Sequence, residues 1–594
     1  MADMVSLTID GQKVQVSKET TIFEAAKKIN INIPHLCYHE ELSIYGACRI
    51  CVVEVEGRPR LEPSCATVVE EGMVVRTNTP RVRRARKMIV ELLLANHPED
   101  CFTCERNQTC ELRKLAYDLG IRDLRFKKAR KYHYEPDTTS PAIIRDPNKC
   151  IQCSRCIRVC SEIQSVGAIE FVNRGAKTQV LTFFNKGINN VECTTCGQCI
   201  LACPTGALRE RIEVDEIWEV ISNPEKFVVV QTAPAVRAAI GEEFGLPPGT
   251  LVTGKMAAAL RRLGFDKVFD TQFGADLTIM EEAHELIERI KNKGTLPMIT
   301  SCSPGWIKYI EHFFPECLEY LSTCKSPQQM FGSIAKTYYA EKLNIDPKKI
   351  CVVSIMPCVA KKFEAKRPEM MSAFEYWKEK LTLNEEDKFF DVDFVLTTRE
   401  AARMIKEVGI NFVNLPDEDF DEPLGISTGA GVIFGATGGV MEAALRTAYE
   451  VVTGKTLERI EFEKVRGMKG IKETEVNLDG LNLKVAVAHG LSNAKVLLEQ
   501  VQKGESSYHF IEIMACPGGC LGGGGQPIPT NLEIRKARAR SLYQEDKNKP
   551  IRKSHQNPAI ITLYKEFLGK PLSEKAHHLL HTTYTKRGRY LKEN

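Results

Sequence analysis

Apolar and polar residues alternate along the first stretch of the chain, residues 4–16. Every second residue is apolar on either side of Asp10 and Gly11. A period of two predicts strands with one buried face, and an Asp-Gly pair between two such runs predicts a tight hairpin turn. A helical pattern follows over residues 21–28. We therefore expect a hairpin followed by a short helix.

Two further patterns predict regular structure beyond this hairpin. Residues 82–94 have a basic, helical pattern. From about residue 211, apolar runs typical of buried strands alternate with helical stretches, most clearly at 227–231, 350–355 and 485–488. This alternation predicts an α/β domain with ligand-binding loops after the strands. The glycine-rich segment 429–439 has no strand–turn–helix frame for a phosphate, so we expect close packing there.

Length and composition limit the classes of protein to consider. A chain of 594 residues is expected to hold several domains. Hydrophobic content of 43% and charged content of 27% are typical of a soluble globular protein. The net charge of +4 is too small to indicate nucleic acid as a partner. The sequence shows no apolar membrane span and no signal-peptide core, so we expect a cytoplasmic protein that binds no membrane.

The 22 cysteines are the unusual feature of the composition. In a long chain of this kind they indicate bound metal rather than disulfides. All but three fall in groups with the spacing of metal ligands, and the three are Cys317, Cys324 and Cys351. We expect these three to be small buried hydrophobic residues.

Two groups in the first part of the chain have four candidate ligands each. Their spacings are C-x10-C-x2-C-x13-C for Cys37, Cys48, Cys51 and Cys65, and H-x3-C-x2-C-x5-C for His97, Cys101, Cys104 and Cys110. Sets of this kind bind either zinc or iron–sulfur clusters. The first spacing differs from the plant-ferredoxin pattern, and the spacing alone leaves both metals open.

Two further groups form an internal repeat typical of ferredoxins that bind two [4Fe–4S] clusters. The fourth cysteine of each run is expected to ligate the cluster of the other run. One cluster is therefore assigned to Cys150, Cys153, Cys156 and Cys203, and the other to Cys193, Cys196, Cys199 and Cys160.

Three loops in the remaining chain resemble a known family. They are Thr-Ser-Cys-Ser-Pro-Gly-Trp at 300–306, Met-Pro-Cys-Val-Ala-Lys-Lys-Phe-Glu at 356–364, and the glycine-rich stretch 512–527 with Cys516 and Cys520. In this order they closely resemble the signature loops of [FeFe]-hydrogenases, which interconvert protons, electrons and H2. The resemblance extends over nearly the whole chain.

The resemblance implies a multidomain α+β and α/β fold. Its expected parts are a β-grasp [2Fe–2S] domain (1–78), a one-His/three-Cys [4Fe–4S] domain (79–125), a two-[4Fe–4S] ferredoxin domain (126–210) and a large α/β H-cluster domain (211–594). The Cys37 group then holds one [2Fe–2S] cluster, and the His97 group holds a [4Fe–4S] cluster. With the ferredoxin repeat this makes three [4Fe–4S] clusters besides the H-cluster.

The resemblance also implies the ligands of the H-cluster, a [4Fe–4S] cubane joined to a diiron unit with CO, cyanide and a bridging dithiolate. Cys358, Cys516 and Cys520 match cubane ligands, and Cys520 also matches the bridge to the diiron unit. Lys361 matches a cyanide contact, for which its positive charge is suited. Met356, Met514 and Gln328 match residues that line the pocket.

The first loop departs from the family pattern, which has two consecutive cysteines. The first relays protons and the second ligates the cubane, but here the pair is Cys302 and Ser303. In one interpretation Cys302 is the relay and Ser303 is the fourth ligand. In the other, the loop shifts so that Cys302 ligates and Ser303 relays.

A proton path is the next implication of the resemblance. Glu282 and Glu285 share one face of a predicted helix, and Arg289 lies four residues after Glu285. Without the resemblance, these residues would be read as an exposed ion pair. With it, the path outward is Cys302, Glu282, Ser322, Glu285 and Arg289.

The first third of the chain most resembles the subunit of NAD-linked, electron-bifurcating hydrogenases. Ferredoxin, a flavin- and NAD-binding subunit and a small [2Fe–2S] subunit are the implied partners. The chain has no dinucleotide fingerprint, so we expect no flavin or NAD on it. The basic connector, with Arg122, Arg125, Lys127, Lys128, Arg130 and Lys131, is either a solvated face or a docking surface for an acidic carrier.

Two other functions remain open at this stage. One is a stand-alone ferredoxin hydrogenase. The other is a sensory or electron-transfer relative with little H2 turnover, which Ser303 keeps in consideration. The three loops, together with Glu282, Glu285 and Lys361, favour catalysis.

Overall fold

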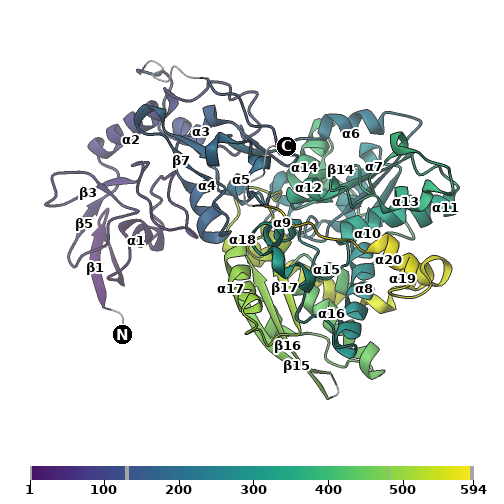
Figure 1. Ribbon diagram of the computed structural model, residues 1–594. Helices are drawn as coiled ribbons and strands as arrows, with labels where there is room; N and C mark the ends of the chain where they lie inside the picture. Colours follow the sequence, from purple (N-terminus) through teal and green to yellow (C-terminus); the bar gives the residue numbers. More distant parts are fainter. Residues whose placement is uncertain (1–2, 127–132, 479, 589–594) are drawn as a thin grey trace.

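The computed structural model describes residues 3–126, 133–478 and 480–588. Figure 1 shows the first 210 residues, in purple to blue, at one end of the molecule and the two larger sheets with their helices at the other. No helix among the described residues has the length and apolar character needed to cross a bilayer.

A five-stranded sheet in the order β2-β1-β5-β3-β4 forms the first unit. Its strands are β1 (Met4–Ile9), β2 (Gln12–Ser17), β3 (Val52–Val55), β4 (Glu62–Pro63) and β5 (Val74–Arg76). Asp10 and Gly11 have φ of 46° and 83°, as a tight hairpin turn with right-handed strand twist requires. The predicted hairpin is confirmed, and helix α1 (Ile22–Lys28) follows with a Thr21–Glu24 capping box.

Short elements connect the cysteine groups up to residue 210. They are α2 (Pro80–Leu94), α3 (Glu111–Asp118), β6 (Ile143–Arg145), α4 (Arg155–Arg158), β7 (Ile169–Val172), β8 (Gln179–Thr182), α5 (Gln198–Ala202) and β9 (Leu208–Glu210). Helix α2 confirms the predicted basic helix. Of the basic connector, Arg125 pairs with the buried Glu91 at 2.5 Å, and Lys127, Lys128, Arg130 and Lys131 lie outside the described residues.

Two four-stranded sheets form the framework of the larger part. One is β11-β10-β13-β14, with all strands parallel, and the other is β12-β17-β16-β15, with only β15 antiparallel. The bounds are β10 (Phe227–Thr232), β11 (Lys267–Asp270), β12 (Met298–Ile299), β13 (Ile350–Met356), β14 (Phe394–Thr397), β15 (Ile471–Leu478), β16 (Leu481–His489) and β17 (Phe510–Met514). The three apolar runs predicted to be strands are confirmed as β10, β13 and β16.

Helices cover both sheets. The longer ones are α6 (Val214–Ile221), α7 (Thr253–Leu263), α8 (Thr271–Lys291), α9 (Pro304–Phe313), α10 (Pro327–Ile334), α14 (Thr398–Glu407), α16 (Gly439–Thr453), α17 (Leu491–Gln502) and α18 (Leu532–Asn548). Helix α8 packs against α10, α15 (Gly429–Ile433) and α16 and is buried on nearly all sides. Close packing of the glycine-rich segment is confirmed, since a Cβ on Gly439 would lie 1.7 Å from the Ile433 carbonyl oxygen.

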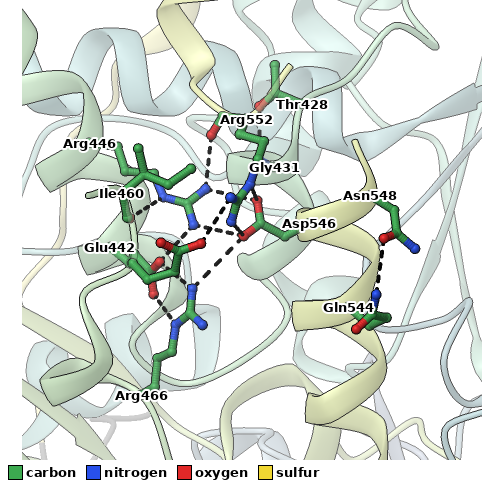
Figure 2. A network of polar contacts seen from close by, with 11 residues as sticks. Thr428, Gly431, Glu442, Arg446, Ile460, Arg466, Gln544, Asp546, Asn548 and Arg552 are labelled. Atoms are coloured by element: carbon green, nitrogen blue, oxygen red, sulfur yellow. Dashed lines mark hydrogen bonds and ion pairs between the residues drawn. The ribbon is translucent and has the colours of Figure 1, made fainter. Parts of the chain in front are cut away.

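A buried network of ion pairs fastens the last part of the chain to this framework (Figure 2). Arg446 of α16 binds Asp546 of α18 through two hydrogen bonds of 2.9 and 2.8 Å, and it also binds Glu442 at 2.7 Å. Arg466 and Arg552 complete the network at 2.6 Å from Glu442 and Asp546. Helices α19 (Pro558–Leu563) and α20 (Glu574–Leu580) then pack beside α8 and α10 (Figure 1).

Candidate active site

A cavity of about 80 Å³ lies where strands of both sheets end. Its wall includes Ala233 after β10, Cys302 after β12, Cys358 after β13 and Cys516 after β17. Parallel strands direct their carboxyl ends to one edge, where α/β proteins place their sites. Two such edges face the same cavity here, so loops distant in sequence meet around it.

Cys358, Cys516 and Cys520 on the cavity wall lie in apolar surroundings, with Cys516 buried and the other two partly buried. Burial raises the pKa of Cys358 and raises that of Cys516 well above its usual value. Burial and the neighbouring Cys358 raise the pKa of Cys520 to about 12. Thiolates are therefore unfavourable there unless a metal compensates their charge. The donor set, soft sulfur in a dry pocket, fits an iron–sulfur centre.

Glycines allow the loop of Cys516 and Cys520 to pass close to the loop of Cys358. A Cβ on Gly523 would lie 2.1 Å from the carbonyl oxygen of Pro357, and Gly518 has a φ of 78°. A side chain at position 523 would push the two loops apart, and the positive φ at position 518 would strain any other residue. The run of glycines thus places the three cysteines on one cavity.

Lys361, Gln328, Met356 and Met514 all line the cavity. The Lys361 ammonium donates to the Cys302 carbonyl at 3.1 Å and to Glu364 at 2.8 Å. Gln328 donates to the same carboxylate at 3.2 Å, whereas its Oε1 is buried without a partner. Sequence reasoning missed Glu364, which the i,i+3 spacing from Lys361 could have indicated.

The loop of Cys302 and Ser303 points its two side chains in different directions. Cys302 packs against the apolar cluster that α8 contributes to, and burial followed by the charge of Glu282 raises its pKa well above the usual value. Ser303 precedes α9 but does not cap it, and its Oγ accepts a hydrogen bond from the backbone N–H of Ala515 at 3.2 Å. Ser303 thus faces the loop of Cys516, and Cys302 faces α8.

Titratable groups continue from Cys302 along α8. Burial, then Glu285 and Glu512, raise the pKa of Glu282 to about 8, and its Oε2 has no hydrogen-bond partner. Ser322 donates to Glu285 at 2.8 Å, and Arg289 donates to Glu285 at 2.7 Å. Glu282 is 1% exposed and Glu285 is 8% exposed. The interpretation as an exposed ion pair is therefore wrong, because the carboxylates lie in the interior.

The first cysteine group is compact. Sγ of Cys51 and Sγ of Cys65 are 3.3 Å apart, and the Cys37 N–H lies 3.4 Å from Sγ of Cys48. Hydrogen bonds from Cys48 and Cys65 hold the pKa of Cys37 well below its usual value. Four cysteine side chains gathered this closely are suited to ligate a metal cluster.

The His97 group shows a free ligand atom. Nδ1 of His97 lies 2.9 Å from the Pro98 carbonyl, and Nε2 is buried without a partner. A metal-ligating histidine has this arrangement, with one nitrogen held by a backbone carbonyl and the other free. Cys110 is half-buried at the start of α3, and burial raises its pKa.

The fourth cysteine of each run in the ferredoxin repeat lies near cysteines of the other run. Cys203 lines a cavity of about 20 Å³ together with Cys150, Cys153 and Cys156. Burial, then the neighbouring Cys193, raise the pKa of Cys160 to about 11. Each short helix of the repeat begins after a residue of positive φ, Ser154 or Gly197.

Direct contacts link these groups to one another and to the cavity of Cys358, Cys516 and Cys520. Sγ of Cys516 lies 3.9 Å from the Cys196 carbonyl oxygen, and Gln198 donates to Gly522 at 2.8 Å. Arg106, beside Cys104, donates to the Cys203 carbonyl at 2.8 Å. Arg158 donates to the Cys37 carbonyl at 2.5 Å. The Cys37 and His97 groups thus both adjoin the ferredoxin repeat.

The three ungrouped cysteines, Cys317, Cys324 and Cys351, are buried as predicted. Cys324 has a polar neighbour in addition, since its Sγ lies 3.6 Å from Oε2 of Glu285.

These features define an iron–sulfur oxidoreductase with a buried thiolate site that several cluster sites adjoin. Family comparisons assign each part. Residues 226–524 match the iron-only hydrogenase large subunit, C-terminal domain, and residues 532–587 match the iron hydrogenase small subunit. Residues 2–80 match a 2Fe-2S iron-sulfur cluster binding domain. Residues 86–125 and 140–209 match an NADH-ubiquinone oxidoreductase-G iron-sulfur binding region and an NADH-quinone oxidoreductase subunit 3 ferredoxin-like domain.

Relatives match the chain over its whole length. The NADP-reducing hydrogenase subunit HndD of Solidesulfovibrio fructosivorans is 53% identical over 99% of this chain and 100% of its own. Iron hydrogenase 1 of Clostridium pasteurianum is 43% identical over 98% and 100%. A solved structure of apo [FeFe]-hydrogenase HydA1 from Chlamydomonas reinhardtii is 45% identical, with a TM-score of 0.55, over 64% of this chain and 100% of that chain. The chain belongs to the [FeFe]-hydrogenase family.

Proposed function

We propose that this protein catalyses the reversible oxidation of H2 to protons and electrons at an H-cluster. The observation that carries the proposal is the cavity itself, where Cys358, Cys516 and Cys520 meet beside a row of buried carboxyl groups that leads away along α8. When bound, the H-cluster supplies the redox chemistry of H2. Cys358, Cys516 and Cys520 would hold its cubane, with Cys520 also reaching the diiron unit.

The Lys361 ammonium contributes a fixed positive charge at the cavity wall. Its hydrogen bonds to Glu364 and the Cys302 carbonyl hold it there. This charge would bind a cyanide ligand of the diiron unit. Met356, Met514 and Gln328 would pack around the same unit, and methionine adapts well to an irregular inorganic surface.

Cys302 is proposed as the proton relay and Ser303 as the residue at the fourth ligand position. The direction of each side chain supports this assignment, because Cys302 faces α8 and Ser303 faces the loop of Cys516. Cys302→Ala is expected to lower turnover about a hundredfold while the spectrum of the reduced cubane persists. Ser303→Ala is expected to change that spectrum. The opposite result would favour the shifted loop.

Protons move along α8 in this proposal, from Cys302 through Glu282, Ser322 and Glu285 toward Arg289. A group relays protons best when its pKa lies near the working pH. The pKa of about 8 for the buried Glu282 meets this condition. The short contacts of Glu285 with Ser322 and Arg289 supply the outer part of the row.

Electrons are proposed to travel through one [2Fe–2S] cluster, three [4Fe–4S] clusters and the cubane. The clusters would belong to the expected domains 1–78, 79–125, 126–210 and 211–594. Two branches, at the Cys37 and His97 groups, adjoin the ferredoxin repeat. Two entrances for electrons would suit an enzyme that exchanges electrons with two partners.

Ferredoxin and NAD-linked subunits are the proposed partners, in an electron-bifurcating complex with a flavin subunit and a small [2Fe–2S] subunit. The 53% identity to a subunit named as NADP-reducing supports the link to a nicotinamide cofactor. Phe102, between Cys101 and Cys104, is 96% exposed, and such an apolar group beside a redox site suits a protein contact. None of the 22 cysteines forms a disulfide, which suits the cytoplasm.

The test is H2 evolution by the anaerobically purified chain with its full set of clusters. Reduced ferredoxin and NADH are supplied singly and together, with and without proteins that co-purify from the native host. The proposal predicts H2 only when both donors and the co-purifying chains are present. Full activity with ferredoxin alone would mean a stand-alone ferredoxin hydrogenase. No H2 under any condition, with clusters intact, would indicate a sensory or electron-transfer role, which the departure at Ser303 favours.

A further inference from the structure

The last segment of the chain places a buried histidine beside the proton row. His581 follows α20, and its side chain is 2% exposed. Its Nε2 lies 3.0 Å from Oε2 of Glu281, and its Nδ1 lies 2.7 Å from the hydroxyl of Thr323. Glu281 also accepts hydrogen bonds from Tyr564 and from the Leu572 N–H. A carboxylate held in this way fixes the orientation of the imidazole.

Glu285 is a second carboxylate close to His581. A carboxylate oxygen of Glu285, Sγ of Cys324 and a ring nitrogen of His581 all lie within 4.8 Å of one another. A metal ion is a poor occupant, because Glu285 already binds Arg289 and the Thr323 N–H, and both nitrogens of His581 have partners. These contacts form a continuous polar network in the protein interior.

A second histidine, at the surface, stacks on His581. His577 is exposed, and its ring stacks on the ring of His581 with centroids 4.4 Å apart and an interplanar angle of 4°. Burial, then the adjacent His581, lower the pKa of His577, although Glu285 and Glu281 act in the opposite direction. The titratable groups that face the pair are Glu281, Glu285, Cys324 and Tyr564.

Arg289 is an unsuitable end for a proton path by itself. A guanidinium group does not lose its proton in proteins, so Arg289 can position Glu285 and balance its charge but does not carry a proton onward. Histidine gains and loses a proton near neutral pH. A row that reaches Glu285 therefore needs a neighbour that titrates.

We propose that His581, oriented by Glu281, takes protons from Glu285 and passes them to solvent beside His577, as a second outer end of the proton row. The inference rests on the proposed path from Cys302 to Glu285. During H2 oxidation the O–H bond of Glu285 breaks and an N–H bond forms at Nδ1 of His581, while Nε2–H stays bound to Glu281. Release of that proton to water restores neutral His581, and the electrons leave separately through the clusters. In H2 evolution the proton moves inward.

The test compares four variants in the fully loaded chain. His581→Gln can keep both hydrogen bonds, because its amide donates to Glu281 and accepts from Thr323, but it does not accept a proton. His577→Leu removes the exposed ring. His578→Leu is the matched control, since His578 is an exposed residue on the same helix and takes part in none of these contacts. Glu282→Gln tests the proposed path itself.

The readouts are the rate of H2 oxidation across pH, the solvent isotope effect, recovery with added imidazole, and cluster content from spectra. His581→Gln is expected to lower the rate at least about tenfold, raise the isotope effect and respond to imidazole. His577→Leu is expected to lower it about threefold, and His578→Leu is expected to match the wild type. A merely structural role for His581 would be satisfied by glutamine and would not respond to imidazole.

The outcomes separate the inference from the proposed function. If Glu282→Gln is inactive while His581→Gln and His577→Leu match the wild type, the second outer end is wrong and the path to Glu285 stands. If Glu282→Gln is fully active, the path itself is wrong. Should His581→Gln lose its clusters, His577→Leu against His578→Leu decides the question alone, because both side chains lie at the surface.

Discussion

Two buried carboxyl groups of this protein, Asp546 and Glu282, have pKa values shifted in opposite directions. Asp546 is fully buried among arginines, and Arg446 and Arg552 both bind it (Figure 2). Burial alone would raise the pKa of Asp546, but these arginines hold it below its usual value. Glu282 is equally buried, yet its Oε2 has no partner and its pKa rises to about 8.

The difference separates a structural carboxylate from one that carries a proton. A buried ion pair stays charged because its partner compensates the loss of hydration, and removing one partner leaves the other uncompensated. A buried carboxyl without a cation near it takes up a proton instead. The network of Asp546 thus fastens α18 to α16, whereas Glu282 is free to gain and lose a proton beside the cavity.

The largest expected effect is on turnover at the proton-carrying site. Glu282→Gln removes the titrating group from the row without changing its size, and H2 turnover is expected to fall about 10²–10⁴-fold. Because glutamine leaves no charge behind, the denaturation midpoint at pH 7 is expected to stay or rise. H2 assays and chemical denaturation of the same preparation measure both. Full turnover in this variant would remove Glu282 from the path.

The structural site is expected to show the reverse. Asp546→Asn leaves Arg446 and Arg552 without their carboxylate, which is expected to cost about 3–5 kcal/mol of stability. Denaturation monitored by circular dichroism measures this loss. Wild-type stability in the variant would mean that solvent already compensates the two arginines.

The pH dependence of stability is expected to have opposite signs at the two sites. Glu282 keeps its proton up to a pH of about 8 in the folded chain, whereas its usual pKa is 4.5. Unfolding in this range releases a proton, so the stability from Glu282 is present below about 4.5 and is lost as pH rises, by up to about 1.4 kcal/mol per pH unit. Glu282→Gln is expected to flatten this slope.

Asp546 contributes stability in the other direction. Since its folded pKa is lowered, its contribution is present above its usual pKa of 3.8 and is lost as pH falls through the folded pKa. Denaturation midpoints between mildly acidic and alkaline pH, for the wild type and both variants, test the two signs together. Parallel curves for all three proteins would contradict this account.

The smallest effect is expected at an exposed ion pair that serves as the control. Arg459 and Glu463 lie 3.5 Å apart with side chains 77% and 72% exposed. Glu463→Gln is expected to change stability by about 0.2–0.5 kcal/mol, less at high salt. A loss as large as that of Asp546→Asn would show that burial does not govern these energies.

The sequence predicts local structure well. The Asp10–Gly11 hairpin and helix α2 both follow from patterns within short windows. These features depend on turn geometry and on helical periodicity, which neighbouring residues determine.

Contacts between distant segments could not be predicted in this way. His581 meets Glu281 across 300 positions of the chain, and Arg446 meets Asp546 across 100. Nothing near either residue in the sequence indicates its partner, because helix packing brings them together: α16 packs against α8, α18 against α15, and α20 against α10. The interior position of Glu285 also depends on that packing, which is why a surface ion pair was a reasonable but wrong interpretation.

The claim that Glu282 is a proton carrier, unlike Asp546, is tested most directly by measuring the protonation state of Glu282. Infrared difference spectroscopy of the full chain, wild type minus Glu282→Gln, isolates the C=O stretch of this carboxylic acid. The account predicts a protonated-carboxyl band at pH 7 that disappears with a midpoint near pH 8. Absence of that band at pH 7, with a carboxylate signal in its place, would show that Glu282 is ionised in the folded protein and would contradict the account.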